Sequence, residues 1–164
     1  MSRRSFLNLL SSLGLGGAAA AGEAAPVAAR ADRVELSDAE WKKRLADGAY
    51  RVLRHESTEP PHSSALNKEK RAGSYHCAGC DLALFASSAK YDSGTGWPSF
   101  WQPLDNAIGT KQESGFLFMA QTEVHCRRCG GHLGHVFKDG PKPTGLRYCM
   151  NGVAMIFKPT GTGA

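Results

Sequence analysis

Four of the five cysteines form two short pairs, and these pairs constrain the fold more than any other feature of the chain. Cys77 and Cys80 lie in "CAGC", and Cys126 and Cys129 lie in "CRRC". Two Cys-x-x-Cys turns can present four thiolates tetrahedrally to a zinc ion. Because 45 residues separate the pairs, the tertiary fold must bring the second turn to the first.

Disulfide bonding is the alternative use of these four cysteines, and it is common in exported proteins. A disulfide inside Cys-x-x-Cys closes a very short loop, so it is typical of a redox pair and contributes little as a cross-link. We therefore expect one zinc ion per chain. Four thiolates would leave it no open coordination position, so its role would be structural.

The first 31 residues differ in composition from the rest of the chain. They begin "MSRRSFL", continue with an apolar run from Phe6 to about Ala21, and contain no acidic residue before Glu23. This pattern is typical of an export signal, and Ser-Arg-Arg-x-Phe-Leu resembles the twin-arginine variety. The alternatives are an amphipathic first helix or a membrane anchor. A transmembrane helix needs about 20 apolar residues, and this run is short and rich in glycine.

We therefore interpret residues 1–31 as an export signal and linker, and residues 32–164 as a single domain. The expected location is the bacterial periplasm, with no stable membrane insertion of the mature chain. The twin-arginine route carries folded proteins, so zinc could be bound before export. We expect a monomer.

The net charge of +5 overstates the basicity of the working protein. Residues 32–164 contain 17 basic and 14 acidic residues, a net charge of +3, and four thiolates around one zinc ion would bring it near +1. The composition therefore does not indicate a nucleic-acid partner.

Helix signals are confined to the start of the expected domain. Ser37 and Glu40 have capping-box spacing, which predicts a helix over "LSDAEWKKRL", and Asp47-Gly48 is expected to end it. Residues 55–73 are polar and interrupted by prolines, which predicts a long loop with at most a turn of helix.

From Ser74 onward, short aromatic and aliphatic runs are separated by glycine or proline turns. We expect strands near residues 74–77, 82–85, 114–120, 122–126, 132–137, 146–151 and 153–158. No strand alternates with a long helix, so a parallel sheet is not expected. The predicted fold is mainly β: a small antiparallel β-barrel or two packed antiparallel sheets, with a few N-terminal helices and the pair of zinc-binding turns.

Cys149, in "GLRYCMNG", remains after the two pairs are assigned. An unpaired cysteine in an exported protein can be a buried inert thiol, an intermolecular disulfide or a reactive nucleophile. Its surroundings favour the nucleophile: Asn151 and Arg147 would share its face of a strand. Other candidate site residues are His132 and His135, just after the second cysteine pair, and Trp97 in the glycine-rich "GTGWPSF".

Cysteine, histidine and asparagine suit two chemistries. One is acyl transfer by a cysteine hydrolase. The other is attack on a sulfur or peroxide centre, which leaves a cysteine sulfenic acid. The residue types alone do not separate the two.

The motifs "KYDSGTGWPSFW" and "CRRCGGHLGHVFKDGPKPTGLRYCMN", together with both cysteine pairs, resemble the methionine-R-sulfoxide reductases, the B-type enzymes. The likeness runs from about Leu36 to Phe157 in the family's order and spacing. It implies a small antiparallel β fold, zinc held away from the active site, and reduction of methionine-R-sulfoxide in proteins by way of a cysteine sulfenic acid.

The resemblance also implies roles for single residues. Cys149 would be the nucleophile, His132 and His135 would face the sulfoxide oxygen, and Asn151 would orient the site. Trp97 would pack against the substrate methyl group, and the remaining substrate-binding residues would be Phe137 and Arg147. Cys77, Cys80, Cys126 and Cys129 would bind zinc.

The chain departs from the family at Thr95, where many members have a second, resolving cysteine. Threonine cannot form a disulfide, so a thioredoxin-like protein or another external thiol would have to reduce Cys149. The alternative to an enzyme is a zinc-ribbon binding module without catalysis, suggested by the two turns and by Arg127 and Arg128. A cysteine hydrolase is the third hypothesis.

Overall fold

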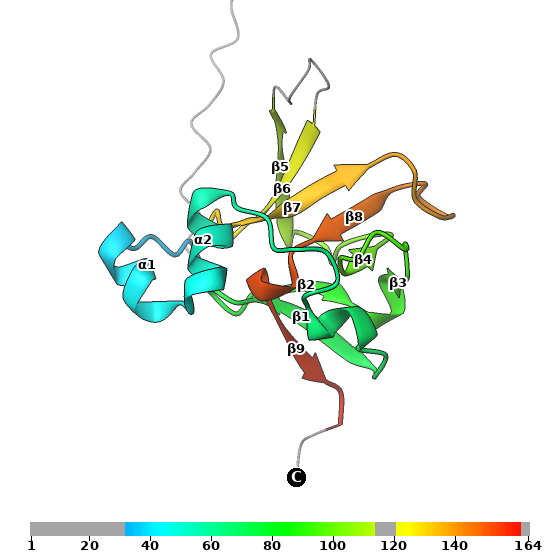
Figure 1. Ribbon diagram of the computed structural model, residues 1–164, viewed down its shortest axis with the longest axis horizontal. Helices are drawn as coiled ribbons and strands as arrows, with labels where there is room; N and C mark the ends of the chain where they lie inside the picture. The colour runs from blue at the N-terminus through cyan, green and yellow to red at the C-terminus, as the bar shows by residue number, and fades with distance from the viewer. Residues whose placement is uncertain (1–31, 114–120, 162–164) are drawn as a thin grey trace, which may run out of the picture.

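The computed structural model describes residues 32–113 and 121–161, which form two antiparallel sheets with two short helices at one side (Figure 1). The expected export signal and the strand expected at 114–120 lie outside the described residues. The elements in chain order are α1 (Asp38–Arg44), α2 (Asp47–His55), η1 (Ala65–Lys68), β1 (Gly73–Cys77), β2 (Ala83–Ala86), η2 (Ser87–Ala89), β3 (Lys90–Tyr91), β4 (Ser99–Phe100), β5 (Ile108–Glu113), β6 (Gln121–Cys126), β7 (His132–Phe137), β8 (Arg147–Met150), η4 (Gly152–Ala154) and β9 (Met155–Pro159).

The first helix confirms the predicted capping box, but it is shorter than expected. The Ser37 backbone N–H donates to the Glu40 carboxylate at 2.8 Å, and α1 ends at Arg44. The prediction that Asp47-Gly48 ends this helix was wrong, because Asp47 begins α2. An acidic residue in the first turn stabilises a helix N-terminus, and the apolar residues that follow are spaced to bury one face of α2.

The strands form a three-stranded sheet in the order β2-β1-β9 and a six-stranded sheet in the order β3-β4-β8-β7-β6-β5. All pairings between them are antiparallel. Within residues 32–113 and 121–161, β3 and β5 are outer strands of the larger sheet, so it is open. The prediction of two packed antiparallel sheets is therefore confirmed, and the described strands form no closed barrel.

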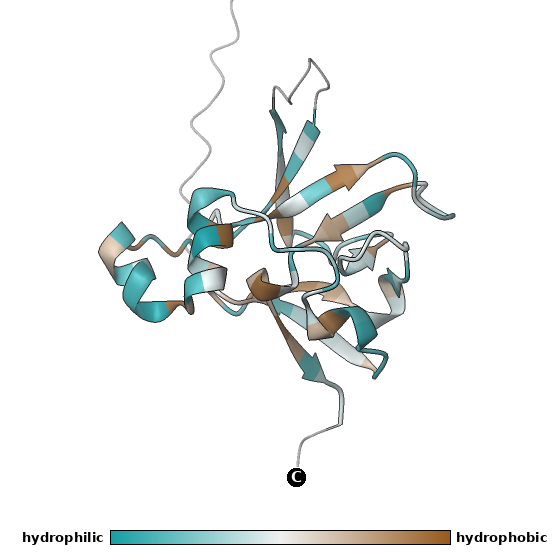
Figure 2. Cartoon of the chain, viewed as in Figure 1, coloured by the Kyte–Doolittle hydropathy of each residue, from teal (hydrophilic) through white to brown (hydrophobic). Residues whose placement is uncertain are grey.

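Aromatic side chains fill the space where the two sheets meet. Phe85 stacks on Phe100 with ring centroids 4.3 Å apart, and Tyr75 lies edge-on to Phe100 at 4.9 Å. All three side chains are completely buried. Figure 2 shows hydrophobic residues on the strands where they converge and hydrophilic residues on the outer turns of the helices. Burial of such aromatic area is the main stabilising contribution to a core of this size.

Within the described residues, the six other expected strands were found, most of them with shifted ends, and the strands that were missed have physical causes. β5 was not predicted because Thr110, Lys111 and Gln112 are polar and exposed, as is common on a sheet edge. β3 and β4 have two residues each, which is too short to show the alternation of apolar and polar residues that identifies a strand. The turn of helix expected within residues 55–73 is η1.

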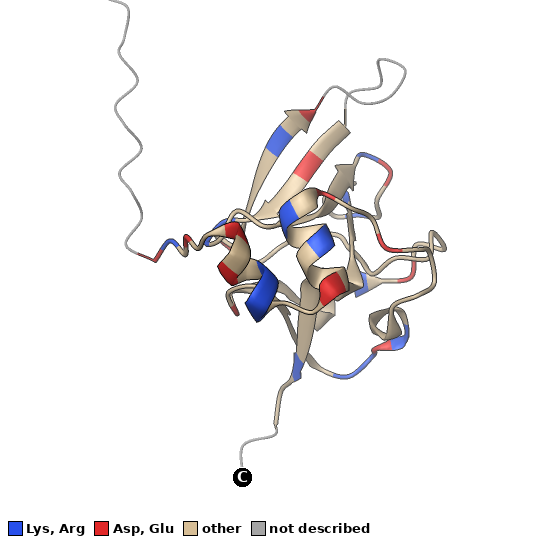
Figure 3. Ribbon diagram, turned by 60° about the vertical axis from the view of Figure 1, so that its left-hand side comes forward, with Lys and Arg blue, Asp and Glu red and all other residues tan. Residues whose placement is uncertain are grey.

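Charged residues are spread over the helices, loops and strands, with acidic and basic positions interspersed (Figure 3). No helix in the described ranges is long and apolar enough to cross a membrane.

Candidate active site

Cys149 lies in the middle of the larger sheet, on β8, between β4 and β7 (Figure 1). Its register partners are Ser99 on β4 and His135 on β7, and Glu123 on β6 is the next residue in this row. Side chains of directly opposed residues point to the same face of a sheet. The fold therefore places a thiol beside an imidazole although the two residues are 14 positions apart.

His132 reaches the same face as His135 through an irregularity in β7. A spacing of three would put the two imidazoles on opposite faces of a regular strand. However, the neighbours Val124 and His125 on β6 pair with Gly134 and His132 on β7. Leu133 between them is therefore one extra residue in β7, a β-bulge. Gly134 at the bulge has a φ of 152°, and the two histidine rings meet edge-on with centroids 5.3 Å apart.

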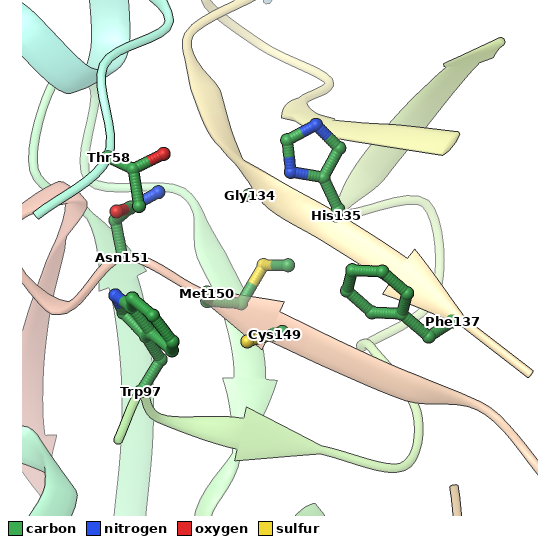
Figure 4. A pocket seen from close by; sticks show the side chains of 8 residues that line it. All are labelled: Thr58, Trp97, Gly134, His135, Phe137, Cys149, Met150 and Asn151. Atoms are coloured by element: carbon green, nitrogen blue, oxygen red, sulfur yellow. The ribbon is translucent and has the colours of Figure 1, made fainter. Parts of the chain in front are cut away.

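A pocket of about 150 Å³ opens over Cys149 (Figure 4). This volume is well below that of a pocket for a drug-sized ligand, so it matches the end of one side chain. Figure 4 shows the Cys149 sulfur between Trp97 on one side and the rings of β7 on the other. The lining residues are Thr58, Trp97, Gly134, His135, Phe137, Cys149, Met150 and Asn151.

Two pocket residues, Trp97 and Asn151, are fixed by the backbone of Glu59. The Trp97 indole N–H donates to the Glu59 carbonyl at 3.0 Å, and the Glu59 N–H donates to Asn151 Oδ1 at 2.9 Å. The Asn151 amide also donates to the Leu133 carbonyl at 3.0 Å. Both ends of this buried amide are therefore committed to the protein, so the Asn151 side chain is fixed where it lines the pocket.

His132 is buried behind the pocket and does not line it. Its Nδ1 lies 2.9 Å from the buried carboxylate of Glu123. With Nδ1 as the donor, the other nitrogen is left free to accept or, when protonated, to donate. Among the described residues, His132 Nε2 has no hydrogen-bond partner. His135 lines the pocket, and its Nε2 lies 3.5 Å from Glu113.

Phe137 forms the far wall of the pocket, and Arg147 lies outside the lining. The Arg147 guanidinium stacks over the Phe137 ring at 4.3 Å, a favourable cation–π contact. It also donates two hydrogen bonds, of 2.9 and 2.8 Å, to Asp139. These bonds raise the pKa of Arg147 and lower that of Asp139. Arg147 therefore supports a pocket wall, and the structure does not place it in contact with the cavity.

The four paired cysteines meet at one point in the fold. Their Sγ atoms lie within 4.8 Å of one another, and the shortest contacts join the two turns: 3.6 Å from Cys77 to Cys129 and 3.5 Å from Cys80 to Cys126. A disulfide requires about 2.05 Å. Tetrahedral zinc with Zn–S bonds of about 2.3 Å separates its sulfurs by about 3.8 Å. The cluster therefore fits a metal ion and not a pair of disulfides.

The electrostatics of the cluster also fit a cation. Hydrogen bonding with Cys126 raises the pKa of Cys77 and lowers that of Cys80, because four crowded sulfurs cannot all ionise unless a positive ion is among them. Both turns have the same geometry, with a left-handed residue after the second cysteine: Asp81 at φ 63° and Gly130 at φ 66°.

The sequence did not identify Thr58, Glu59, Glu123, Ser93 or Ser99 as parts of the site. Glu123 carried one signal, since it is an acidic residue at an inward position of the apolar strand "TEVHC". Glu59 lies in a polar, proline-rich loop, and its burial follows from tertiary contacts alone. Thr95, expected at the family's resolving-cysteine position, lies with its Oγ1 3.8 Å from Cys149 Sγ.

Comparison with known proteins gives a consistent match. The SelR domain model matches residues 45–159. A protein of Leptospira interrogans named peptide methionine sulfoxide reductase MsrB is 50% identical over 125 residues, which is 76% of this chain and 95% of the relative. An MsrB of Pseudomonas putida is 48% identical over 127 residues, 77% of this chain and 96% of that protein.

A chloroplastic relative extends the comparison to plants. The peptide methionine sulfoxide reductase B1 of Oryza sativa is 47% identical over 125 residues, which is 76% of this chain and 58% of that protein. The matched region contains all the strands that the structure describes, both cysteine turns and the whole pocket. The chain therefore belongs to the SelR family, the B-type peptide methionine sulfoxide reductases.

Proposed function

We propose that this chain reduces methionine-R-sulfoxide in oxidised proteins, with Cys149 as the nucleophile. The observation that carries the proposal is the register of β7 and β8, which sets Cys149 beside His135 in a side-chain-sized pocket closed by Trp97. Family membership and the names of its relatives agree with this reaction.

The chemistry needs a nucleophile and an acid on either side of a polarised S–O bond. The Cys149 thiolate attacks the sulfoxide sulfur while His135 donates a proton to the sulfoxide oxygen. The S–O bond of the substrate breaks, and the oxygen ends on the Cys149 sulfur. The products are methionine and a cysteine sulfenic acid, so one thiol and one sulfoxide account for every atom.

Epimer selection follows from the walls of the pocket. The Trp97 indole is held by its N–H bond to Glu59, so it is a fixed apolar surface for the substrate methyl group. His135 stands on the other side of Cys149. When the methyl group lies against Trp97 and the oxygen points toward His135, only one epimer of the sulfoxide can direct the rest of its side chain out of the pocket. We assign this epimer as R.

His132 and Glu123 support the acid in this scheme. The buried carboxylate fixes the His132 ring, which in turn contacts the ring of His135. A fixed imidazole with a free Nε2 can pass a proton toward the sulfoxide oxygen or bind the water that replaces it.

Recycling must use an external thiol, because Thr95 occupies the place beside Cys149 that a resolving cysteine would need. The other four cysteines are gathered in the zinc-type cluster. The reductant we propose is a thioredoxin-like protein or another thiol that attacks the Cys149 sulfenic acid directly.

We assign one structural zinc ion per chain to Cys77, Cys80, Cys126 and Cys129. When bound, this ion would stabilise the fold by joining the β1–β2 turn to the β6–β7 turn. None of its four ligands lines the pocket.

We also propose that residues 1–31 are a twin-arginine export signal and that residues 32–164 work as a monomeric domain in the periplasm. Supporting this, the SelR match begins at residue 45, and the N-terminal composition is that of a signal. Detection of the mature N-terminus in a periplasmic fraction would test the location.

A zinc-ribbon module would explain the four cysteines but leave the pocket unused. The arginines that suggested it are engaged within the chain: Arg127 pairs with Asp32 at 2.6 Å, and Arg128 donates to the Cys80 carbonyl at 3.2 Å. The reductase proposal accounts for both the pocket and the cluster.

The test of the proposal uses the full chain with the two dabsylated epimers of methionine sulfoxide and dithiothreitol. The R epimer should be reduced, and Cys149→Ser should abolish the reaction. Cys149→Ser should keep the thermal stability of the unmodified chain, which separates loss of chemistry from loss of fold. Turnover of the S epimer in place of the R epimer would refute the assignment.

A further inference from the structure

Three hydroxyl groups form a continuous chain that ends at the nucleophilic sulfur. Ser99 Oγ lies 2.7 Å from Ser93 Oγ, which lies 2.8 Å from Thr95 Oγ1. Thr95 Oγ1 in turn lies 3.8 Å from Cys149 Sγ. At the other end, Ser99 Oγ lies 3.1 Å from the Trp97 carbonyl. The reaction proposed above uses none of these hydroxyls.

The direction of such a chain is set as a unit, because each hydroxyl has one hydrogen to donate. If Ser99 donates to the Trp97 carbonyl, then Ser93 donates to Ser99 and Thr95 donates to Ser93. The Thr95 oxygen is then left to accept a hydrogen bond from the Cys149 thiol. For Thr95 to donate to Cys149 with both hydroxyl–hydroxyl bonds kept, all three hydroxyls must turn together, and Ser99 then gives up its hydrogen bond to the Trp97 carbonyl.

We propose that Thr95, Ser93 and Ser99 are a reversible hydrogen-bond relay for Cys149. The relay accepts a hydrogen bond from the Cys149 thiol. After the hydroxyls turn, it donates a hydrogen bond to the thiolate, and later to the oxygen of the sulfenate that forms on the same sulfur. The sulfenate part rests on the proposed function. Thr95 touches the reacting sulfur and is a catalytic residue on this proposal, while Ser93 and Ser99 are positioning residues.

The environment makes such a relay effective. Ser99 is completely buried, so its hydrogen-bond partners are those of the protein, and hydrogen bonds in a region of low dielectric strengthen one another. The loop that bears Thr95 is also held in place, since the Gly96 carbonyl accepts from the His62 N–H at 2.7 Å and from the Asn67 amide at 2.9 Å.

Two other donors near Cys149, both within the described ranges, are already engaged and do not supply the same hydrogen bond. The Trp97 N–H is committed to Glu59, and Arg147 is committed to Asp139. The titratable groups that face or act on Cys149 are His135 on β7, Arg147 on β8 and Tyr91 on β3. Burial raises the pKa of Tyr91, so it stays neutral through the pH range of the test. The register partner on β4 is Ser99, which has no charge.

The test measures the rate of Cys149 alkylation by iodoacetamide against pH, read by mass spectrometry of the Cys149 peptide. Thr95→Val should move the midpoint of this profile up by about one pH unit, a tenfold loss of thiolate at a given pH, or about 1.4 kcal/mol. Ser93→Ala and Ser99→Ala should move it in the same direction by less. Thr95→Ser should restore it, because the hydroxyl is kept.

Thr122→Val on β6 is the matched control, since it removes a hydroxyl that accepts from the Gln112 amide and lies outside the relay, and it should leave the profile unchanged. An unchanged midpoint in Thr95→Val would overturn the relay, as would a shift that Thr95→Ser does not restore. Ser93→Ala provides a second variant if Thr95→Val does not fold. Alkylation needs no sulfoxide, so the result stands apart from the outcome of the reductase assay.

Discussion

Replacing Glu59 should loosen the active site and the fold together, because this residue ties three segments to one point. Its buried carboxylate accepts the N–H of Gly152 at 2.6 Å and that of Val153 at 3.0 Å. Its backbone fixes Asn151 and Trp97 through the two hydrogen bonds described above. The segment after α2, the start of η4 and the glycine-rich loop therefore share one anchor.

The cost of Glu59→Ala can be estimated from the groups it leaves behind. A buried donor without a partner costs about 1–3 kcal/mol. The Gly152 N–H is buried and loses its acceptor outright, whereas Val153 is 37% exposed, so water can replace the acceptor there. We expect a loss of about 2 kcal/mol, which corresponds to a fall in Tm of roughly 8 °C for a domain of this size. Glu59→Gln keeps one acceptor oxygen and should lose about half as much.

Thermal unfolding followed by circular dichroism gives the stability, and reduction of a methionine-R-sulfoxide peptide gives the activity. We expect kcat/KM of Glu59→Ala to fall about tenfold, mainly through KM, since a displaced Trp97 misplaces the substrate. Glu35→Ala is the matched control: that carboxylate is exposed and forms a surface ion pair with Arg33, so its loss should cost under about 1 kcal/mol. A Tm for Glu59→Ala within 2 °C of the unmodified chain would refute the reasoning.

Three further predictions follow from the geometry. Cys126→Ser should lower both zinc content, measured by atomic absorption, and thermal stability, because a structural site contributes folding free energy; full stability in a metal-free, unoxidised sample would contradict it. Gly134→Ala should abolish activity and lower soluble yield, because an added Cβ would overlap the Cys149 carbonyl oxygen; an active, stable variant would show that β7 can move away from β8. One equivalent of sulfoxide should leave a Cys149 sulfenic acid that dimedone labels once per chain, and Thr95→Cys should suppress the label through a disulfide; a wild-type disulfide from Cys149 to a cluster cysteine would contradict the metal assignment.

The parts of the fold that could be predicted are those with a local cause. The capping box at Ser37 and Glu40 has a fixed spacing, and the buried strands are short apolar runs between turns. The start of α2 was missed because Asp47-Gly48 is a turn signal by composition, while the helix is stabilised by burial of Leu53 and its neighbours against the core. Tertiary packing overrode the local signal there.

The candidate site divides in the same way. Cys149, His135 and Trp97 could be proposed from their own motifs, and all three line the pocket. The positions of Glu59 and Glu123 could not be proposed, since each depends on a partner more than eight residues away in the chain: Gly152 for Glu59 and His132 for Glu123. Arg147 shares the strand face of Cys149, but Phe137 and Asp139 hold its side chain beside the pocket.

The surroundings of Cys149 also restrict how the sulfenic acid of the proposed mechanism can be reduced. Thr95 contacts the sulfur on the side where an internal thiol would attack, and β4 and β7 flank β8 on either side. The pocket is then the route by which an external thiol meets the sulfur, and this route is free only after methionine has left. Because the pocket is the size of one side chain, a protein reductant must present its thiol on a protruding segment, whereas a small thiol can enter alone. It follows that methionine at high concentration should slow the reduction of the sulfenic acid as a competitor for the same pocket.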